Sequence, residues 1–244
     1  MENRNNFDYE EITSAYGNDG QTTIVASAFS ALMRKVYVWM ALALVVSGLT
    51  ALYVSRSAGL LQMAGSGIWL LVIAELALVI FLTARIHKMS FQTAGIMFVL
   101  YSVLNGVTLS FIFLAYTMSS IATTFFVTAG TFAAMSLIGY GTRRDLSSMG
   151  RYLLFALIGL IIATVVNLFL GNGLLNLVIS AVGVLVFVGL TAYDTQKIKQ
   201  MFLMNGTDVN EGTQKLALMG SLMLYLDFIN LFLYLLRFFG RSNN

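Results

Sequence analysis

Three acidic residues lie inside long apolar stretches of this sequence: Glu75, Asp194 and Asp227. A charged side chain at the centre of a bilayer costs about 2.5–3.5 kcal/mol on insertion scales, so a carboxylate placed there is a candidate functional group. Carboxylates supply the hard oxygen ligands that suit Ca²⁺, and they also hold and release protons. The positions of these three residues therefore predict proton or cation chemistry inside a membrane.

Asp194 and Asp227 are expected to form a pair. They occupy the sixth and seventh apolar stretches, which would be antiparallel neighbours, and a rise of about 1.5 Å per residue places both about 10–16 Å from the cytoplasmic ends of their helices. Two carboxylates about 4 Å apart repel by about 4 kcal/mol at an effective dielectric of 20. We expect them to titrate as one coupled unit, with one proton retained near neutral pH. Such a pair can sense pH, relay a proton or bind a cation.

Polar residues share the helix faces of these two aspartates. Thr191 lies on the same face as Asp194, and Asn230 lies on the same face as Asp227. Polar stripes in membrane helices normally face the interior of the bundle. Thr191 and Asn230 are therefore predicted to support the aspartate pair.

Two further ionisable residues belong to the second apolar stretch. Arg85 ends this stretch at a depth comparable with that of Asp194, so it could form an ion pair with either aspartate. The alternative is that its long side chain extends to the lipid headgroups. Glu75 lies mid-helix without an obvious partner and is a candidate for lining the same interior pathway.

The composition restricts the class of protein. Of the 244 residues, 58% are hydrophobic and 10% are charged, whereas soluble domains average about 45–50% apolar and about 25% charged residues. The absence of cysteine excludes disulfide scaffolds, iron–sulfur clusters, thiolate zinc sites and cysteine nucleophiles. No basic run argues for nucleic-acid binding. Because there is no proline, glycines such as Gly159, Gly183 and Gly189 are expected where helices bend or approach closely.

Apolar stretches of membrane-spanning length recur along the chain. A spanning helix needs about 20 mostly apolar residues, and each stretch has roughly 18–25. The sequence thus predicts an all-α integral membrane protein with a seven-helix domain over residues 31–239. A polar N-terminal tail (1–30), without the features of a signal peptide, and a short C-terminal tail (240–244) would flank it. The predicted spans are Val36–Val54, Gly67–Ala84, Phe91–Ala115, Ile121–Gly141, Tyr152–Leu170, Leu174–Tyr193 and Leu216–Phe239.

The placement of Lys and Arg predicts the orientation. Eleven of the 14 would lie on one side of the membrane, and Arg56, Arg237 and Arg241 on the other. By the positive-inside rule the N-terminus is cytoplasmic and the C-terminus lies outside. Arg237 and Arg241 would suit the cytoplasm, so a re-entrant last segment is the alternative. Among the connections, only residues 197–215 are expected to be long enough to carry structure of their own.

Three sequence elements resemble the Bax inhibitor-1 family, also called the transmembrane Bax inhibitor motif family. They are LTAYDTQKIK (Leu190–Lys199), LYLDFINLFLYLLRFF (Leu224–Phe239) and TRRDLSSMGRYL (Thr142–Leu153), and the resemblance extends over about residues 31–239. It implies a seven-helix bundle in which the last helix is enclosed by the other six.

The resemblance also implies a function, a pH-sensitive calcium leak across the membrane. The family's paired aspartates would be Asp194 and Asp227, which would bind Ca²⁺ weakly and transiently, as conduction requires. Its helix-two arginine latch would be Arg85, and its helix-two acidic residue would be Glu75. The sequence looks like a bacterial member in the plasma (inner) membrane, with the lipid bilayer and calcium ions as partners and no other cofactor.

Two other functions are compatible with seven apolar spans and intramembrane aspartates. The first is a non-transporting regulator that binds another membrane protein, such as a membrane protease, through the polar N-terminal tail. The second, an intramembrane aspartyl protease, would also place aspartates on helices six and seven. However, Asp227 follows Leu224-Tyr225-Leu226 instead of Gly-x-Gly, and a chain without proline lacks the Pro-Ala-Leu element of those enzymes. The chain is therefore not expected to be an enzyme.

Overall fold

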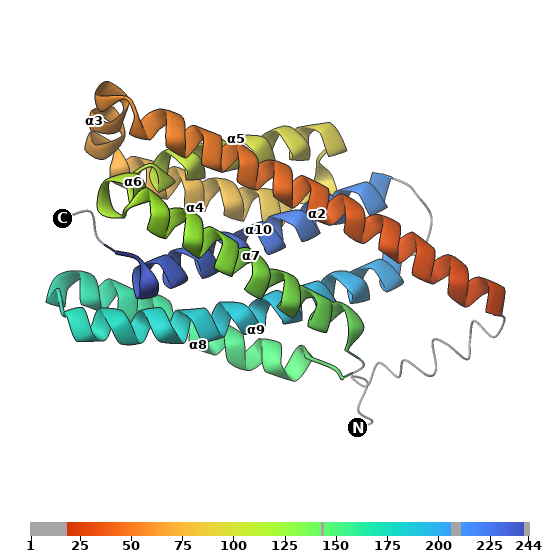
Figure 1. The fold of residues 1–244 in the computed structure, drawn as a ribbon. Coiled ribbons are helices and arrows are strands. Elements are labelled where there is room, and N and C mark those ends of the chain that lie inside the picture. The colour runs from red at the N-terminus through yellow and green to blue at the C-terminus, as the bar shows by residue number, and fades with distance from the viewer. Residues whose placement is uncertain (1–18, 143, 206–210, 242–244) are drawn as a thin grey trace.

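The computed structural model describes residues 19–142, 144–205 and 211–241, and their regular elements are helices (Figure 1). In this part of the chain, seven helices are long and apolar enough to cross a membrane, which confirms the predicted all-α, seven-span architecture. The elements are α2 (Asp19–Ser55), α3 (Ala58–Ser66), α4 (Ile68–Arg85), the 3₁₀ turn η1 (Ile86–Lys88), α5 (Phe91–Leu109), α6 (Ile112–Ala115), α7 (Met118–Gly141), α8 (Ser147–Leu170), α9 (Gly173–Asn205) and α10 (Glu211–Phe239).

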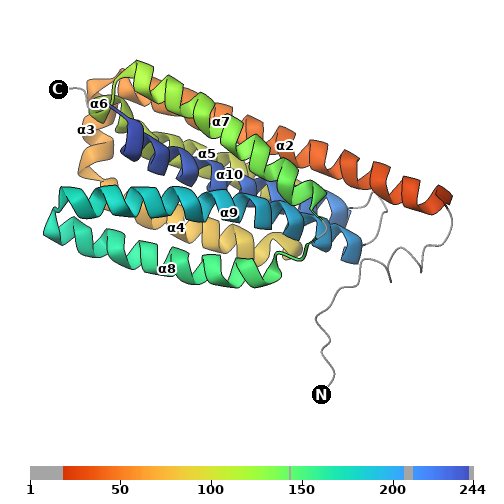
Figure 2. The ribbon, with the colours of Figure 1, turned by 60° about the horizontal axis from the view of Figure 1, so that its bottom comes forward.

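The last helix, α10, is the most buried of the seven spans. In its apolar window 72% of the residues are buried, compared with 33% or fewer in each of the other six. It packs on α2, α5, α7 and α9, whereas α4 packs mainly on α5 and α8 packs on α9 (Figures 1 and 2). Polar side chains on α10 are therefore shielded from lipid, while α4 and α8 turn most of their apolar surface outward.

Aromatic contacts hold α10 against its neighbours. The Tyr225 ring meets Phe98 of α5 edge-on at 5.7 Å, and the Phe228 ring meets Phe132 of α7 at 5.5 Å. Edge-to-face aromatic pairs contribute about 0.5–1.5 kcal/mol beyond their buried area. All residues of α10 from Leu216 to Leu236 are buried or half-buried, so contacts with the neighbouring helices cover this stretch.

The first and sixth spans extend further than their apolar stretches indicate. Helix α2 begins at Asp19, not near residue 31, and α9 continues to Asn205. The extensions pack on the bundle: the Phe29 ring stacks on Tyr140 at 5.2 Å and lies 5.5 Å from Phe202. Hydropathy marks the part of a helix that crosses lipid, whereas these protein contacts determine where the helices end. Of the predicted tails (1–30 and 240–244), residues 1–18 and 242–244 lie outside the described residues.

The connections also differ from the expectation. Most of the segment 197–215 is simply the end of α9 and the start of α10, and residues 206–210 lie outside the described residues. The connection after the first span instead carries α3, whose N-cap Ser57 accepts a hydrogen bond from the Leu60 backbone at 3.5 Å. A serine N-cap satisfies one of the free backbone N–H groups of the first turn, so this short segment can form a helix.

Helix α10 is continuous over 29 residues, about 43 Å at 1.5 Å per residue, which is enough for a full crossing. Immediately after it, the Arg241 backbone bonds to Thr117 (3.2 Å) and Ser120 (3.0 Å) at the start of α7. These contacts hold the end of α10 opposite to the end at which α2 begins (Figure 1). A re-entrant last segment, which would turn back within this helix, is therefore wrong.

Glycine allows close helix approach at some positions but not at all the predicted ones. A Cβ atom on Gly183 would clash with the Tyr234 ring, and one on Gly189 would press on Leu153. A Cβ atom on Gly159, in contrast, would meet nothing within 4 Å, so the expectation of a close helix contact there is wrong. Gly139 allows α7 to approach α9 closely, because a Cβ atom on Gly139 would overlap the carbonyl group of Ala192.

Candidate functional site

Asp227 is the most enclosed acidic side chain of the described residues. Only 4% of its surface is exposed, and its Oδ2 atom is buried without a hydrogen-bond partner in the described part of the protein. The charges that act most strongly on it belong to Asp194 and Lys197, both on the adjacent helix α9. An unpartnered buried carboxyl oxygen is costly, so it indicates a group that binds a proton or an ion.

Asp194 faces the same electrostatic cluster from α9. Lys197 is three residues further along this helix, which places the ammonium group and the carboxylate on one face, and its charge acts on both aspartates. The Lys197 Nζ atom also lies 5.7 Å from the centre of the Tyr193 ring. Two carboxylates and one ammonium group thus act on one another electrostatically, with a net charge of −1 when all three are ionised.

Lys197 is a site residue that the sequence analysis missed, since it served there only as a charge that indicated orientation. The available signal was its spacing, because positions i and i+3 of a helix are neighbours. Arg85, the predicted latch, is exposed at the end of α4. Among the described residues, no ion pair joins Arg85 or Lys197 directly to either aspartate, and Lys197 acts on them only through its charge.

A chain of hydroxyl groups positions the α9 segment that carries Asp194. The Tyr37 and Ser136 hydroxyls are 2.6 Å apart, and Ser136 is 3.0 Å from the Thr195 hydroxyl. Thr195 in turn donates to the Thr191 carbonyl at 2.8 Å. This chain joins α2, α7 and α9 beside the aspartate, so it holds Asp194 at a defined rotation of its helix.

The two predicted supporting residues bond to their own helices. The Thr191 hydroxyl donates to the Phe187 carbonyl at 2.8 Å, and the Asn230 amide donates to the Leu226 carbonyl at 2.8 Å. These bonds satisfy polar groups within the membrane domain. The hydroxyl proton of Thr191 is consequently directed away from the aspartate pair in this structure.

Gln196 anchors the connection between α7 and α8 next to the site. Its side chain is 1% exposed, its Oε1 atom accepts a hydrogen bond from the Leu146 backbone at 2.8 Å, and its Nε2 atom donates to the Arg144 carbonyl at 2.8 Å. Both bonds satisfy backbone groups of the connection between α7 and α8. Hydrogen bonds from Gln196 therefore connect the α7–α8 connection to the part of α9 that carries Asp194.

Glu75 lies in a separate polar cluster. It accepts a hydrogen bond from Thr108, and Asn105 is a second partner. The Tyr225 hydroxyl donates to Asn105 at 3.0 Å and lies 2.7 Å from the Ser47 hydroxyl. The sequence analysis did not identify these partners of Glu75, although Asn105 and Thr108 share one face of the third span.

The two clusters lie on different sides of α10. Tyr225 and Asp227 are two residues apart, so their side chains are rotated by about 200° around a helix with 3.6 residues per turn. Tyr225 faces the Glu75 cluster and Asp227 faces α9. In this structure α10 thus lies between Glu75 and the aspartate pair, although Glu75 was a candidate for lining the same pathway.

The described residues hold no group of three or more His, Cys, Asp or Glu side chains that could bind a metal ion. Ca²⁺ usually takes six to eight oxygen ligands. The aspartate pair alone supplies at most four side-chain oxygens, so any Ca²⁺ there would need further oxygen ligands from water or the backbone.

Comparison with known proteins shows the family of this chain. Residues 29–244 match the model of the family described as "Inhibitor of apoptosis-promoting Bax1". The chain belongs to the Bax inhibitor-1 family. It is 49% identical over 211 residues to the inner membrane protein YbhL of Escherichia coli K12, covering 85% of this chain and 90% of the relative. Two uncharacterized proteins, from Rickettsia prowazekii (47% identity, 87% and 90% covered) and Borreliella burgdorferi (44%, 87% and 92%), are also similar.

In this Bax inhibitor-1 family protein, the matched region includes all seven spans except the first turns of α2. Both aspartates lie in the segments from which the resemblance was recognised, YDTQ on α9 and LYLDF on α10. The family relation identifies an integral membrane protein.

Proposed function

We propose that this protein is a pH-sensitive calcium leak pathway of a bacterial inner membrane. The observation that carries the proposal is the buried, unpartnered Oδ2 atom of Asp227, which lies in the electrostatic field of Asp194 and Lys197. The location is supported by the similarity to YbhL, an inner membrane protein.

The proposed pH dependence follows from competition between protons and calcium ions. With both aspartates ionised, the pair has a charge of −2, which Lys197 reduces to −1, and a passing Ca²⁺ ion is attracted. A proton on one aspartate leaves the cluster neutral and removes that attraction. Protons and calcium ions thus compete for the same oxygens, so flux depends on pH.

The enclosure of Asp227 also sets the expected rate. Because 4% of the side chain is exposed, an ion reaches it only when the helices packed against α10 move. Such collective motions take microseconds to milliseconds. We therefore expect a slow leak and not the conductance of an open channel.

In this proposal Lys197 is the counter-ion of the pair in the present conformation. Arg85 would take that role only in a conformation that brings it from its exposed position toward the aspartates. The two cations can be distinguished by substituting each one.

Calcium flux into liposomes tests the proposal. The purified protein is reconstituted around a trapped calcium dye, and initial uptake is measured from mildly acidic to mildly alkaline pH. Uptake should exceed that of protein-free liposomes, depend on pH, and fall in Asp227→Asn. The control Asp145→Asn, which removes an exposed carboxylate from the α7–α8 connection, should retain it. Absence of uptake above protein-free liposomes across this range would contradict the proposal.

A further inference from the structure

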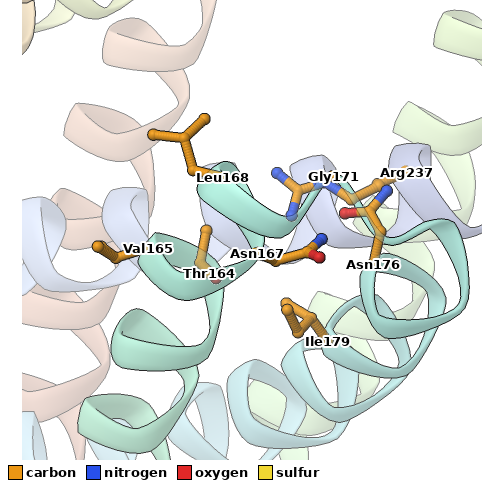
Figure 3. A pocket seen from close by; sticks show the side chains of 8 residues that line it. All are labelled: Thr164, Val165, Asn167, Leu168, Gly171, Asn176, Ile179 and Arg237. Atoms are coloured by element: carbon orange, nitrogen blue, oxygen red, sulfur yellow. The ribbon is translucent and has the colours of Figure 1, made fainter.

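A hollow of about 440 Å³ lies at the end of the bundle where α8 turns into α9 and α10 ends (Figure 3). It is remote from the aspartate pair along α10, because Arg237 is ten residues, or about 15 Å, beyond Asp227. The hollow is lined by Thr164, Val165, Asn167, Leu168, Gly171, Asn176, Ile179 and Arg237.

One side of the hollow presents hydrogen-bond donors. The side chains of Arg237, Asn167 and Asn176 point into the same space, as Figure 3 shows. Arg237 is held in place by the Tyr234 ring, whose centre is 5.4 Å from the guanidinium carbon and which stacks on Phe187 at 5.7 Å. No acidic residue lines the hollow, and no ion pair within the described residues neutralises Arg237. A fixed guanidinium group with amide donors beside it suits a phosphate.

The other side of the hollow is apolar and open to lipid. Val165 and Leu168 line it and are 52% and 67% exposed, and Phe169 and Leu174 beside it are 84% and 73% exposed. Side chains of this kind, on membrane-spanning helices, contact acyl chains. An occupant must therefore combine an anionic group with a hydrocarbon chain.

We propose that this hollow binds an anionic glycerophospholipid of the surrounding leaflet. Its phosphodiester group lies against Arg237, Asn167 and Asn176, and an acyl chain follows Val165 and Leu168. The site gives a reason for Arg237, a cation at the end of the bundle with few positive charges, where the positive-inside rule disfavours it. It is independent of the proposed calcium leak, since it shares no residue with the aspartate pair.

Native mass spectrometry of the detergent-purified full chain, titrated with phosphatidylglycerol, tests the site. Arg237→Gln removes the charge-assisted hydrogen bonds and should weaken binding of the first lipid about tenfold. Arg241→Gln is the matched control, because Arg241 is exposed at the same end of α10 and does not line the hollow. Asn176→Asp, which places a carboxylate against the phosphate, should also weaken binding and provides a second variant if Arg237→Gln does not fold.

Two competitors distinguish the source of the phosphate. Phosphatidylcholine, whose headgroup carries a compensating cation, should bind more weakly than phosphatidylglycerol, and millimolar inorganic phosphate should not displace the lipid. Displacement by inorganic phosphate would instead indicate a free-anion site and overturn the proposal. Equal lipid binding by wild type, Arg237→Gln and Asn176→Asp would overturn it as well, as would an equal loss in Arg241→Gln.

Discussion

Replacing either aspartate of the pair by asparagine should move the pH midpoint of calcium flux to lower values. Helices packed like α9 and α10 have axes about 8–10 Å apart, so carboxyl groups that face each other across this contact are about 4–8 Å apart. At an effective dielectric of 20, their repulsion is then about 2–4 kcal/mol, equivalent to about 1.5–3 pH units. Removing one charge abolishes this repulsion, and the remaining carboxylate can ionise in more acidic solution.

The assay compares flux-versus-pH curves for wild type, Asp194→Asn and Asp227→Asn in dye-loaded liposomes. Asparagine retains the shape of aspartate and most of its hydrogen-bonding capacity, so the substitution isolates the charge. Asp145→Asn controls for the loss of a carboxylate outside the membrane-spanning helices. Size-exclusion profiles and thermal unfolding in detergent establish that each variant is folded before reconstitution.

The two Asn variants must differ from wild type in midpoint, amplitude or both if the carboxylates act as a coupled pair. Both variants retaining the wild-type midpoint and amplitude would refute the reasoning. In that case Asp194 and Asp227 would have a structural role in the contact between α9 and α10.

Three further predictions concern a charge near the aspartates, a close helix contact and the orientation in the membrane. Lys197→Gln removes the cation that acts on both aspartates, so it should raise the pH midpoint of calcium flux by up to about one unit. Arg85→Gln should shift this midpoint less, because Arg85 is exposed. An equal or larger shift in Arg85→Gln would identify Arg85 as the counter-ion. Gly139→Ala places a methyl group against the α9 backbone and should lower stability by about 1–3 kcal/mol in detergent unfolding, while Gly159→Ala, which meets open space, should be neutral or slightly stabilising. The chain has no cysteine of its own, so a cysteine introduced as Gly59→Cys can be labelled selectively. It should react with an impermeant thiol reagent in intact cells, because the connection after the first span is predicted to lie outside. Reaction only after permeabilisation would contradict the predicted cytoplasmic N-terminus.

The architecture was largely predictable, because the bilayer imposes a length and an apolar composition on each span. The third span, Phe91–Ala115, has the predicted bounds, although it is divided into α5 and α6. The errors lie where protein contacts replace lipid contacts, as at Phe29, whose packing on Tyr140 and Phe202 accompanies a first helix that starts at Asp19. The prediction for the α3 segment failed for another reason, since capping by Ser57 is a local feature that hydropathy does not register.

The sequence by itself determined that Asp194 and Asp227 lie within membrane helices and that these helices are antiparallel neighbours. The tertiary structure decided which groups surround them. Helix rotation and tilt in a membrane are set by packing against neighbouring helices. That packing turns Asp227 toward Asp194 and Lys197 and leaves Arg85 exposed, while Glu75 bonds to Thr108 on the other side of α10. A side chain's depth follows from its position in the chain, but its partners follow from the rotation of its helix, and only the assembled bundle defines that rotation.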